Sequence, residues 1–221
     1  MGMKLHWSPR SPFVRKVMIV LHETGQVDQV ETVRSVVAAH LPPNRAVLAD
    51  NPLGKIPTLL TEEGLALFDS RVVCEYLDMR AGTGLFPADP AQRFRQLRWQ
   101  ALGDGLLDIL LVWRTELSRP AGPWEALTGA LLVKVRAAMQ RLEAEAQDLA
   151  DAPFGIGQIA ITCALGQLDL RWHDCGWRAA FPRLGRAAAD WEGRPSVAAV
   201  PVIDDGPEGA EMTAGQLRFA D

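Results

Sequence analysis

The sequence predicts two domains, an α/β domain with a mixed sheet in βαβ–ββα order followed by an all-α domain. Three observations lead to this fold class. Strand-like and helix-like patterns alternate over residues 1–80, glycine and proline concentrate over residues 81–90, and residues 91–221 are helical in composition. A chain of 221 residues is long enough for two modest domains, each with its own hydrophobic core.

The first half of the α/β domain is predicted as a strand, a helix and a second strand. Residues 4–7 have the pattern of a short strand, and a helix with apolar residues at helical spacing begins at Pro12. Ser11 before Pro12 is typical of a helix N-cap followed by proline in the first helical position. Residues 27–33 supply β-branched residues for a second, parallel strand.

The second half of this domain is predicted as a hairpin followed by a helix. Residues 56–61 and 65–68 are short strands separated by a turn of two glutamates and a glycine. Asp69 and Ser70 then offer an N-cap for the next helix. Residues 40–51 can hold a short helix but give no firm pattern.

The rest of the chain is predicted as a linker, a set of long helices and a polar tail. Residues 81–90 contain two glycines and two prolines, which is typical of a connection between domains. Four helices are expected, over residues 92–117, 124–149, 157–172 and 181–191. Residues 204–221 are polar and glycine-containing, and we expect them to form a surface tail.

Composition excludes several functional classes. The net charge of −4 and the absence of a long basic run argue against a nucleic-acid partner. No apolar stretch approaches the length of a membrane span, and no signal-peptide pattern opens the chain, so we expect a cytoplasmic protein without a membrane partner. Three cysteines and four histidines lie too far apart in the sequence for a disulfide framework or a metal site, and we expect no metal.

Three motifs, in order, resemble those of one known family. They are SPRSPFVRKV at residues 8–17, NPLGKIPTL at residues 51–59 and FDS at residues 68–70. Together they resemble the cytosolic glutathione S-transferases, in particular the bacterial serine-type members. The resemblance covers residues 3–80 well and extends to the helical half mainly in layout. It implies a thioredoxin-like N-terminal domain that binds glutathione as co-substrate and a helical C-terminal domain that binds the second substrate.

Ser11 is the catalytic residue that this resemblance implies. Glutathione transfer needs a thiolate near neutral pH, whereas a free cysteine thiol has a pKa of about 8.5. A hydroxyl at a helix N-terminus can donate a hydrogen bond to sulfur, and the helix amides add partial positive charge. Ser8 is the competing hydroxyl and ranks second because it lies before the cap.

Other activation chemistries lack a residue in the first loop. The single tyrosine, Tyr76, falls within a later predicted helix, and no cysteine precedes Cys74. The sequence therefore excludes the tyrosine activation that some members of the family use, and it disfavours the redox chemistry of glutaredoxin-like relatives.

The remaining glutathione-binding residues also come from the resemblance. Ile56 and Pro57 are expected to share a cis peptide bond that lets the Ile56 backbone pair with the cysteinyl part of glutathione. Lys55 can meet the glycine carboxylate or can simply be a solvated lysine. Ser70 is expected to bind the γ-glutamyl carboxylate at a helix N-terminus, and Asp69 to pair with the ammonium group, although glutamate or glutamine is more usual there.

The helical half carries two further expectations. The family builds its electrophile pocket on the first long helix of this domain, which places Trp99, Leu106, Leu110, Trp113 and Arg114 as candidate lining residues, with a core role as the alternative. Gly155 and Gln158 stand where the family has a buried capping box, and Gln158 can still reach back to a backbone N–H.

The sequence therefore predicts a serine-type glutathione transferase that conjugates the glutathione thiolate to an apolar electrophile in detoxification. The family resemblance also implies a homodimer. Two alternatives stay open: a non-catalytic glutathione-fold protein with a binding or stress-regulatory role, and a glutathione-dependent isomerase or lyase.

Overall fold

The computed structural model describes residues 2–38, 41–205 and 217–219. The chain divides into two compact units. Residues 1–94 and 195–205 form what we call the N-terminal unit, and residues 95–194 and 206–221 form the helical unit. The predicted linker at residues 81–90 lies within the N-terminal unit, and the division falls inside a helix.

The N-terminal unit is built on a mixed four-stranded sheet with strand order β2-β1-β3-β4. β1 pairs in parallel with β2, Met3 opposite Val30, and antiparallel with β3, which pairs antiparallel with β4. The parallel pair is the βαβ unit and the antiparallel pairs complete the ββα unit, so the predicted fold class is confirmed. The strands are β1 (Met3–Trp7), β2 (Val30–Arg34), β3 (Thr58–Leu60) and β4 (Ala66–Leu67).

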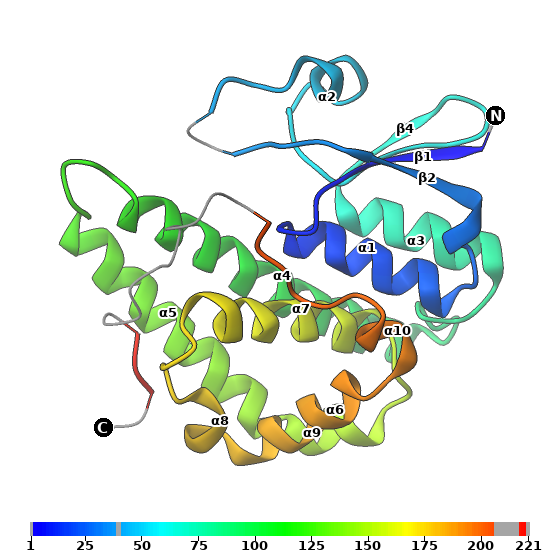
Figure 1. Ribbon diagram of the computed structural model, residues 1–221. Coiled ribbons are helices and arrows are strands. Elements are labelled where there is room, and N and C mark those ends of the chain that lie inside the picture. Colours follow the sequence, from blue (N-terminus) through cyan, green and yellow to red (C-terminus); the bar gives the residue numbers. More distant parts are fainter. Residues whose placement is uncertain (1, 39–40, 206–216, 220–221) are drawn as a thin grey trace. The chain divides into compact units, whose positions relative to one another are not determined.

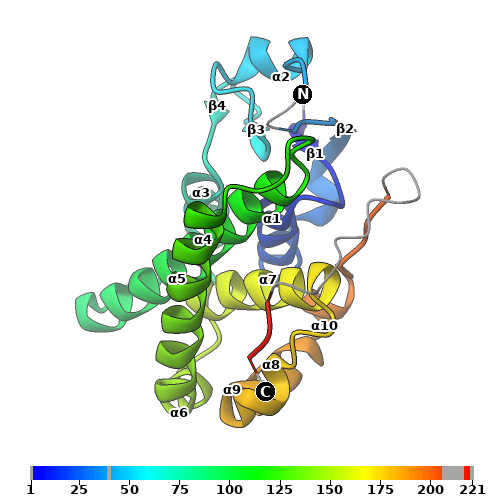
Figure 2. The same cartoon turned by 90° about the vertical axis from the view of Figure 1, so that its left-hand side faces the viewer.

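Helices cover both faces of this sheet. α1 (Pro12–Glu23) and α3 (Ser70–Ala81) lie side by side on one face, and α2 (Arg45–Asp50) lies on the other side (Figures 1 and 2). α2 forms within residues 40–51, which lack a firm sequence pattern, and its N-terminus is capped by the Asn44 side chain. The second strand begins later than predicted, because Val27–Gln29 forms a 3₁₀ turn closed by a hydrogen bond from Gln29 N to the Gln26 carbonyl.

The chain returns to the N-terminal unit after the helical unit. α10 (Pro195–Ala198) packs against α1, and the buried Arg15 donates from Nε to the Val200 carbonyl at 2.8 Å. Asp204 then forms an ion pair with Arg10 at 2.6 Å, so the first residues of the predicted surface tail are held in place. The rest of that tail lies outside the described residues, apart from residues 217–219.

The helical unit comprises most of α4 and five further helices among its described residues. Glu145 separates α5 from α6, where the sequence predicted one helix over residues 124–149. Its carboxylate accepts hydrogen bonds from Arg98 at 2.9 Å and from the Trp99 indole at 2.7 Å. These tertiary contacts offset the free-energy cost of interrupting the helix. The helices are α4 (Pro90–Leu117), α5 (Glu125–Ala144), α6 (Ala146–Asp151), α7 (Ile156–Arg171), α8 (Trp177–Ala180) and α9 (Pro182–Glu192).

α7 is the core of the helical unit, since nearly all of its residues are buried. It packs closely on α4 because glycines stand at the contact: a Cβ added to Gly103 would lie 2.7 Å from the backbone of Ala160. At its N-terminus the Gly155 N–H donates to the Gln158 side chain at 3.2 Å, which confirms the predicted reach of that glutamine.

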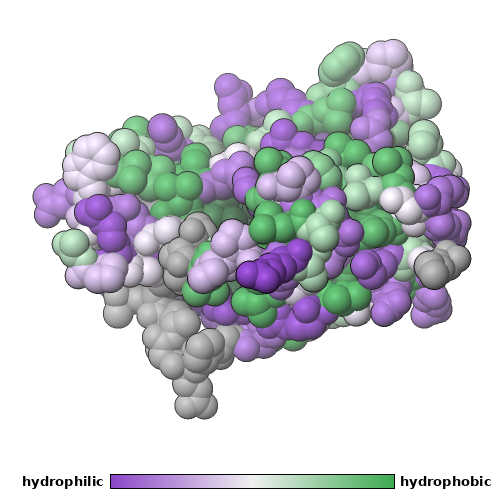
Figure 3. Space-filling model, turned by 90° about the horizontal axis from the view of Figure 1, so that it is seen from above, coloured by the Kyte–Doolittle hydropathy of each residue, from purple (hydrophilic) through white to green (hydrophobic). Residues whose placement is uncertain are grey.

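The surface mixes apolar and polar residues. In Figure 3, hydrophobic and hydrophilic side chains alternate over the face that is seen. Exposed apolar side chains near α2 include Leu48 and Leu53. Among the described residues, the structure contains no helix with the length and apolar composition needed to span a bilayer.

Candidate functional site

Ser11 is the N-cap of α1. Its backbone is extended (φ −85°, ψ 116°), Pro12 takes the first helical position, and its Oγ accepts a hydrogen bond from Val14 N at 3.3 Å. This contact uses a lone pair of the hydroxyl oxygen and leaves the hydroxyl hydrogen available for another acceptor. The first turn of α1 contains no acidic residue that would oppose an anion there.

Two arginines flank the loop that precedes Ser11. Arg34, at the end of β2, donates from Nη1 to the buried Ser8 hydroxyl at 3.0 Å and also pairs with Asp205. Arg10 pairs with Asp204. The Ser8 hydroxyl therefore accepts a hydrogen bond from the Arg34 guanidinium, whereas the Ser11 hydroxyl accepts one from a backbone N–H of α1.

The second motif forms a loop built around the buried Asn51. The Asn51 amide nitrogen donates to the Lys55 carbonyl at 3.1 Å and to the Thr58 hydroxyl at 3.0 Å, while its oxygen accepts from Leu53 N at 3.0 Å. The Lys55 side chain is exposed. An asparagine side chain that bonds to the backbone in this way fixes a tight turn from within.

Ile56 and Pro57 follow in this loop and are joined by a cis peptide bond, as the sequence analysis predicted. The Ile56 side chain is buried in a cluster with Val14 of α1 and Val47 of α2. Val14 is also the residue whose backbone N–H donates to the Ser11 hydroxyl oxygen. Val14 therefore links Ser11 and Ile56, since its side chain packs with Ile56 and its backbone N–H donates to Ser11.

Asp69 and Ser70 begin α3. Asp69 is the N-cap, its carboxylate accepts from Arg71 N at 2.9 Å, and its own backbone follows a cis peptide bond from Phe68. The Asp69 side chain is exposed, and Ser70 is buried at the first helical position. Both residues therefore stand at a helix N-terminus, where backbone N–H groups are left without helical partners.

His6, which the sequence analysis did not select, is a buried polar residue of β1. Its imidazole contacts the Ser35 hydroxyl and the Asp50 carboxylate, each at 2.8 Å. The hydrogen bond from His6, together with the nearby Lys4, lowers the pKa of Asp50, whereas partial burial acts in the opposite direction. A lone histidine in a strand gives no motif, so only the tertiary contacts single it out.

The predicted electrophile-pocket residues lie on α4 in the helical unit. Trp99, Leu106, Leu110 and Trp113 are each at most 1% exposed, and Arg114 is half-buried. Two of them have packing partners in the same unit: the Trp99 indole donates to Glu145, and the Trp113 ring lies 5.9 Å from that of Trp172. This burial favours the core role that the sequence analysis left open, and their contact with an electrophile stays a prediction.

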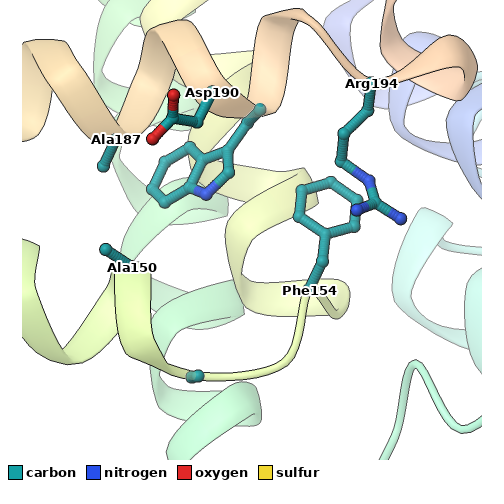
Figure 4. Close-up of a pocket in the computed structure, with 7 residues that line it drawn as sticks. Ala150, Phe154, Ala187, Asp190 and Arg194 are labelled. Carbon is teal, nitrogen blue, oxygen red and sulfur yellow. The ribbon is translucent and has the colours of Figure 1, made fainter.

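The described residues of the helical unit form at least two surface hollows. One, of about 230 Å³, is shown in Figure 4. It is lined by Ala150 of α6, Ala152 just after that helix, Phe154, Ala187, Asp190, Trp191 and Arg194. The Arg194 guanidinium lies 4.1 Å from the centre of the Phe154 ring. A second, of about 410 Å³, lies between α4 and α5, and Leu106 is the one predicted pocket residue among those that line it.

The cysteines and potential metal ligands do not form a second site. Cys74, Cys163 and Cys175 are buried and form no disulfide with one another, and burial raises the pKa of the Cys175 thiol. Within residues 2–38, 41–205 and 217–219, no three His, Cys, Asp or Glu side chains gather closely enough to hold a metal ion.

Comparison with known proteins identifies the family. A sequence model described as "Glutathione S-transferase, N-terminal domain" matches residues 10–80. The uncharacterized GST-like protein YibF of Escherichia coli (strain K12) is 35% identical over 204 residues, which cover 89% of this chain and 96% of YibF. The chain belongs to the glutathione S-transferase family.

Solved structures of other glutathione S-transferase family members match over the whole fold. A glutathione transferase family member from Pseudomonas fluorescens Pf-5, with bound glutathione, is 40% identical with a TM-score of 0.87; the match covers 92% of this chain and all of that one. A glutathione S-transferase from Methylobacillus flagellatus KT, also with glutathione bound, is 33% identical with a TM-score of 0.84, over 91% of this chain and all of that one. The N-terminal domain is therefore thioredoxin-like, as in these glutathione S-transferases.

Proposed function

We propose that this glutathione S-transferase family member binds glutathione in its N-terminal unit and transfers the glutathione thiolate to an apolar electrophile. The binding residues in this proposal are Ser11, Lys55, Ile56, Pro57, Asp69 and Ser70. Support comes from the two relatives that hold glutathione and from the geometry of the three segments that carry these residues.

The observation that carries the proposal is the hydrogen bonding of Ser11. Its oxygen accepts from Val14 N and thereby orients the hydroxyl at the N-terminus of α1. The hydroxyl hydrogen is then available to donate to the cysteinyl sulfur of glutathione, and the helix dipole favours the anionic form of that sulfur. Capping of α1 and thiolate stabilisation are therefore compatible roles for one side chain.

The other segments suit the remaining parts of the tripeptide. The cis bond between Ile56 and Pro57 and the Asn51 contacts define the backbone that would pair with the cysteinyl residue. The start of α3 offers Ser70 and unpaired N–H groups to the γ-glutamyl carboxylate, with Asp69 for the ammonium group. The exposed Lys55 is free to reach the glycine carboxylate.

Rate enhancement in this proposal comes from thiolate formation and from positioning of the two substrates. The electrophile would bind at the helical domain, where the residues on α4 remain our candidates. We further propose a cytoplasmic homodimer that acts in detoxification, and family membership is the support for this proposal. Light scattering coupled to gel filtration tests the dimer directly.

The test is glutathione titration calorimetry followed by conjugation of a chloronitrobenzene acceptor with the same protein. Binding with turnover supports the transferase. Binding without turnover favours the regulatory alternative or, if an isomerase substrate reacts, the isomerase or lyase alternative. Absence of glutathione binding by the wild-type protein refutes the proposal.

Substitution of Ser70 tests the assigned division of roles. Ser70→Ala removes a hydroxyl from the proposed carboxylate site, and we expect weaker glutathione binding with kcat largely retained at saturating glutathione. Ser11→Ala is expected to lower kcat with glutathione affinity nearly unchanged. Equal losses in both parameters for both variants would contradict the assignment.

A further inference from the structure

His6 joins three elements of the N-terminal unit. It lies in β1, the residue is 1% exposed, and both ring nitrogens are engaged in polar contacts. Nδ1 is 2.8 Å from the hydroxyl of Ser35, just beyond β2, and Nε2 is 2.8 Å from Oδ2 of Asp50, the last residue of α2. One buried ring therefore ties α2 to the centre of the sheet.

The donor and acceptor at each contact follow from the chemistry of the partners. A carboxylate can only accept, so Nε2 carries the proton and donates to Asp50. The Ser35 hydroxyl can donate to Nδ1, or it can donate to the Val33 carbonyl at 3.1 Å and accept from the ring. The contact with Asp50 is charge-assisted, and it is the stronger of the two.

Asp50 connects directly to the proposed glutathione loop. The next residue, Asn51, holds the backbone of Lys55 and the hydroxyl of Thr58, which places the backbone of Ile56 between them. α2 has only six residues, and a helix of that length is not stable by itself in water. Its position must therefore be set by tertiary contacts.

Two such contacts act on α2, one near its middle and one at its last residue. Val47 packs with Ile56 and Val14 in the cluster described above, and Asp50 is held by His6. Lys4 also approaches Asp50, at 3.5 Å, but its side chain is 37% exposed, so solvent screens that pair. The buried imidazole is the main polar anchor for the C-terminal end of α2.

We propose that His6 is a positioning residue for glutathione binding: through Asp50 it fixes the end of α2, and so the backbone of Lys55 and Ile56. This inference rests on the proposed function. Without the anchor, α2 and its loop occupy the binding-competent arrangement for only part of the time. The apparent dissociation constant for glutathione then rises in inverse proportion to that fraction, and a competent population of about one tenth weakens binding about tenfold.

The experiment compares substitutions on the two sides of the His6 ring. His6→Phe removes both ring contacts. Asp50→Ala removes the contact of the ring with α2, together with the solvent-screened pair with Lys4. Ser35→Ala removes the contact of the ring beside β2 and the local hydrogen bond to the Val33 carbonyl. Calorimetric titration with glutathione is expected to give about tenfold weaker binding for the first two variants and for their double variant, because they break the same link. Ser35→Ala, as the matched control, should stay within about twofold of the wild-type protein.

Two further measurements separate positioning from general destabilisation. Amide hydrogen exchange of the folded proteins should rise over residues 45–54 in Asp50→Ala and stay at wild-type levels in Ser35→Ala. His6→Gln, whose amide can still donate to Asp50, should recover most of the lost affinity. Asp50 is partly exposed, so its variant tests the proposal even if His6→Phe does not fold.

Several results would overturn this assignment. These are wild-type affinity in Asp50→Ala, an equal loss of affinity in Ser35→Ala, or additive losses in the double variant. If the wild-type protein itself fails to bind glutathione, the proposed function falls and this inference falls with it, and the wild-type titration identifies that case before any variant is compared.

Discussion

Replacement of Ser11 by alanine should separate two roles of one hydroxyl. If Ser11 donates to the bound thiolate, its loss removes a hydrogen bond to a charged group, which contributes about 1.5–3 kcal/mol. One pKa unit corresponds to about 1.4 kcal/mol, so the pKa of bound glutathione should rise by about one to two units. Below that pKa the thiolate fraction, and with it kcat, should fall by about ten- to a hundredfold.

The assay is the pH dependence of conjugation at saturating glutathione, together with the ultraviolet absorbance of the bound thiolate. In Ser11→Ala both profiles should move to higher pH and approach the wild-type plateau at alkaline pH. Ser11→Thr retains a hydroxyl and should remain active.

The capping role of Ser11 predicts a different order of the variants in stability than the catalytic role predicts in turnover. The Ser11 side chain accepts from Val14 N, so alanine should destabilise the fold by about 0.5–2 kcal/mol and glycine by only a few tenths. Turnover should nevertheless be equally low in Ser11→Gly and Ser11→Ala if the hydroxyl acts on the thiolate. An active Ser11→Gly variant, or a pH profile that does not move, would refute the catalytic role.

Further predictions concern the helical unit. Glu145→Gln should lower the free energy of unfolding by about 1–3 kcal/mol, because the carboxylate accepts charge-assisted hydrogen bonds. The pKa of Glu145 is lowered, chiefly by its hydrogen bond from Arg98. The stability that the carboxylate contributes is therefore present above its unfolded pKa and is lost as pH falls through its folded pKa. Denaturation at several pH values should show that the stability difference between wild type and Glu145→Gln shrinks in acid. Gly103→Ala should destabilise the fold by about 1–3 kcal/mol, since the added Cβ would lie 2.7 Å from the backbone of Ala160. Gly105 faces open space, so Gly105→Ala should be neutral or stabilising by up to about 1 kcal/mol. Equal melting temperatures for the two variants would contradict the close packing of α4 on α7.

Local sequence determined the features that depend on neighbouring residues. The pair Ser11 and Pro12 predicts a capped helix because the cap contact spans only three residues, and the structure contains it. The reach of Gln158 to Gly155 is of the same kind. The order of strands and helices, and hence the fold class, follows from periodicity and turn residues, which are also local signals.

Family resemblance supplied what local physics could not. Nothing in an isolated Ile-Pro pair predicts a cis bond, since most such bonds are trans. The cis bond between Ile56 and Pro57 was expected only because the surrounding motif resembles that of the glutathione S-transferases. The residues of the electrophile pocket were carried over in the same way, and on α4 they are buried.

Tertiary structure alone decided the contacts between residues far apart in the chain. His6 and Asp50 are separated by 44 positions, and Arg10 and Arg34 meet Asp204 and Asp205 only because the chain returns to the N-terminal unit. α2 and the break at Glu145 belong to this group as well, since each is stabilised by side chains from other elements. Sequence periodicity reports which face of an element is apolar, whereas the partner of a buried polar group depends on how the elements pack. The sequence by itself therefore determined the order of strands and helices in this protein. Tertiary packing determined which residues its buried polar side chains contact.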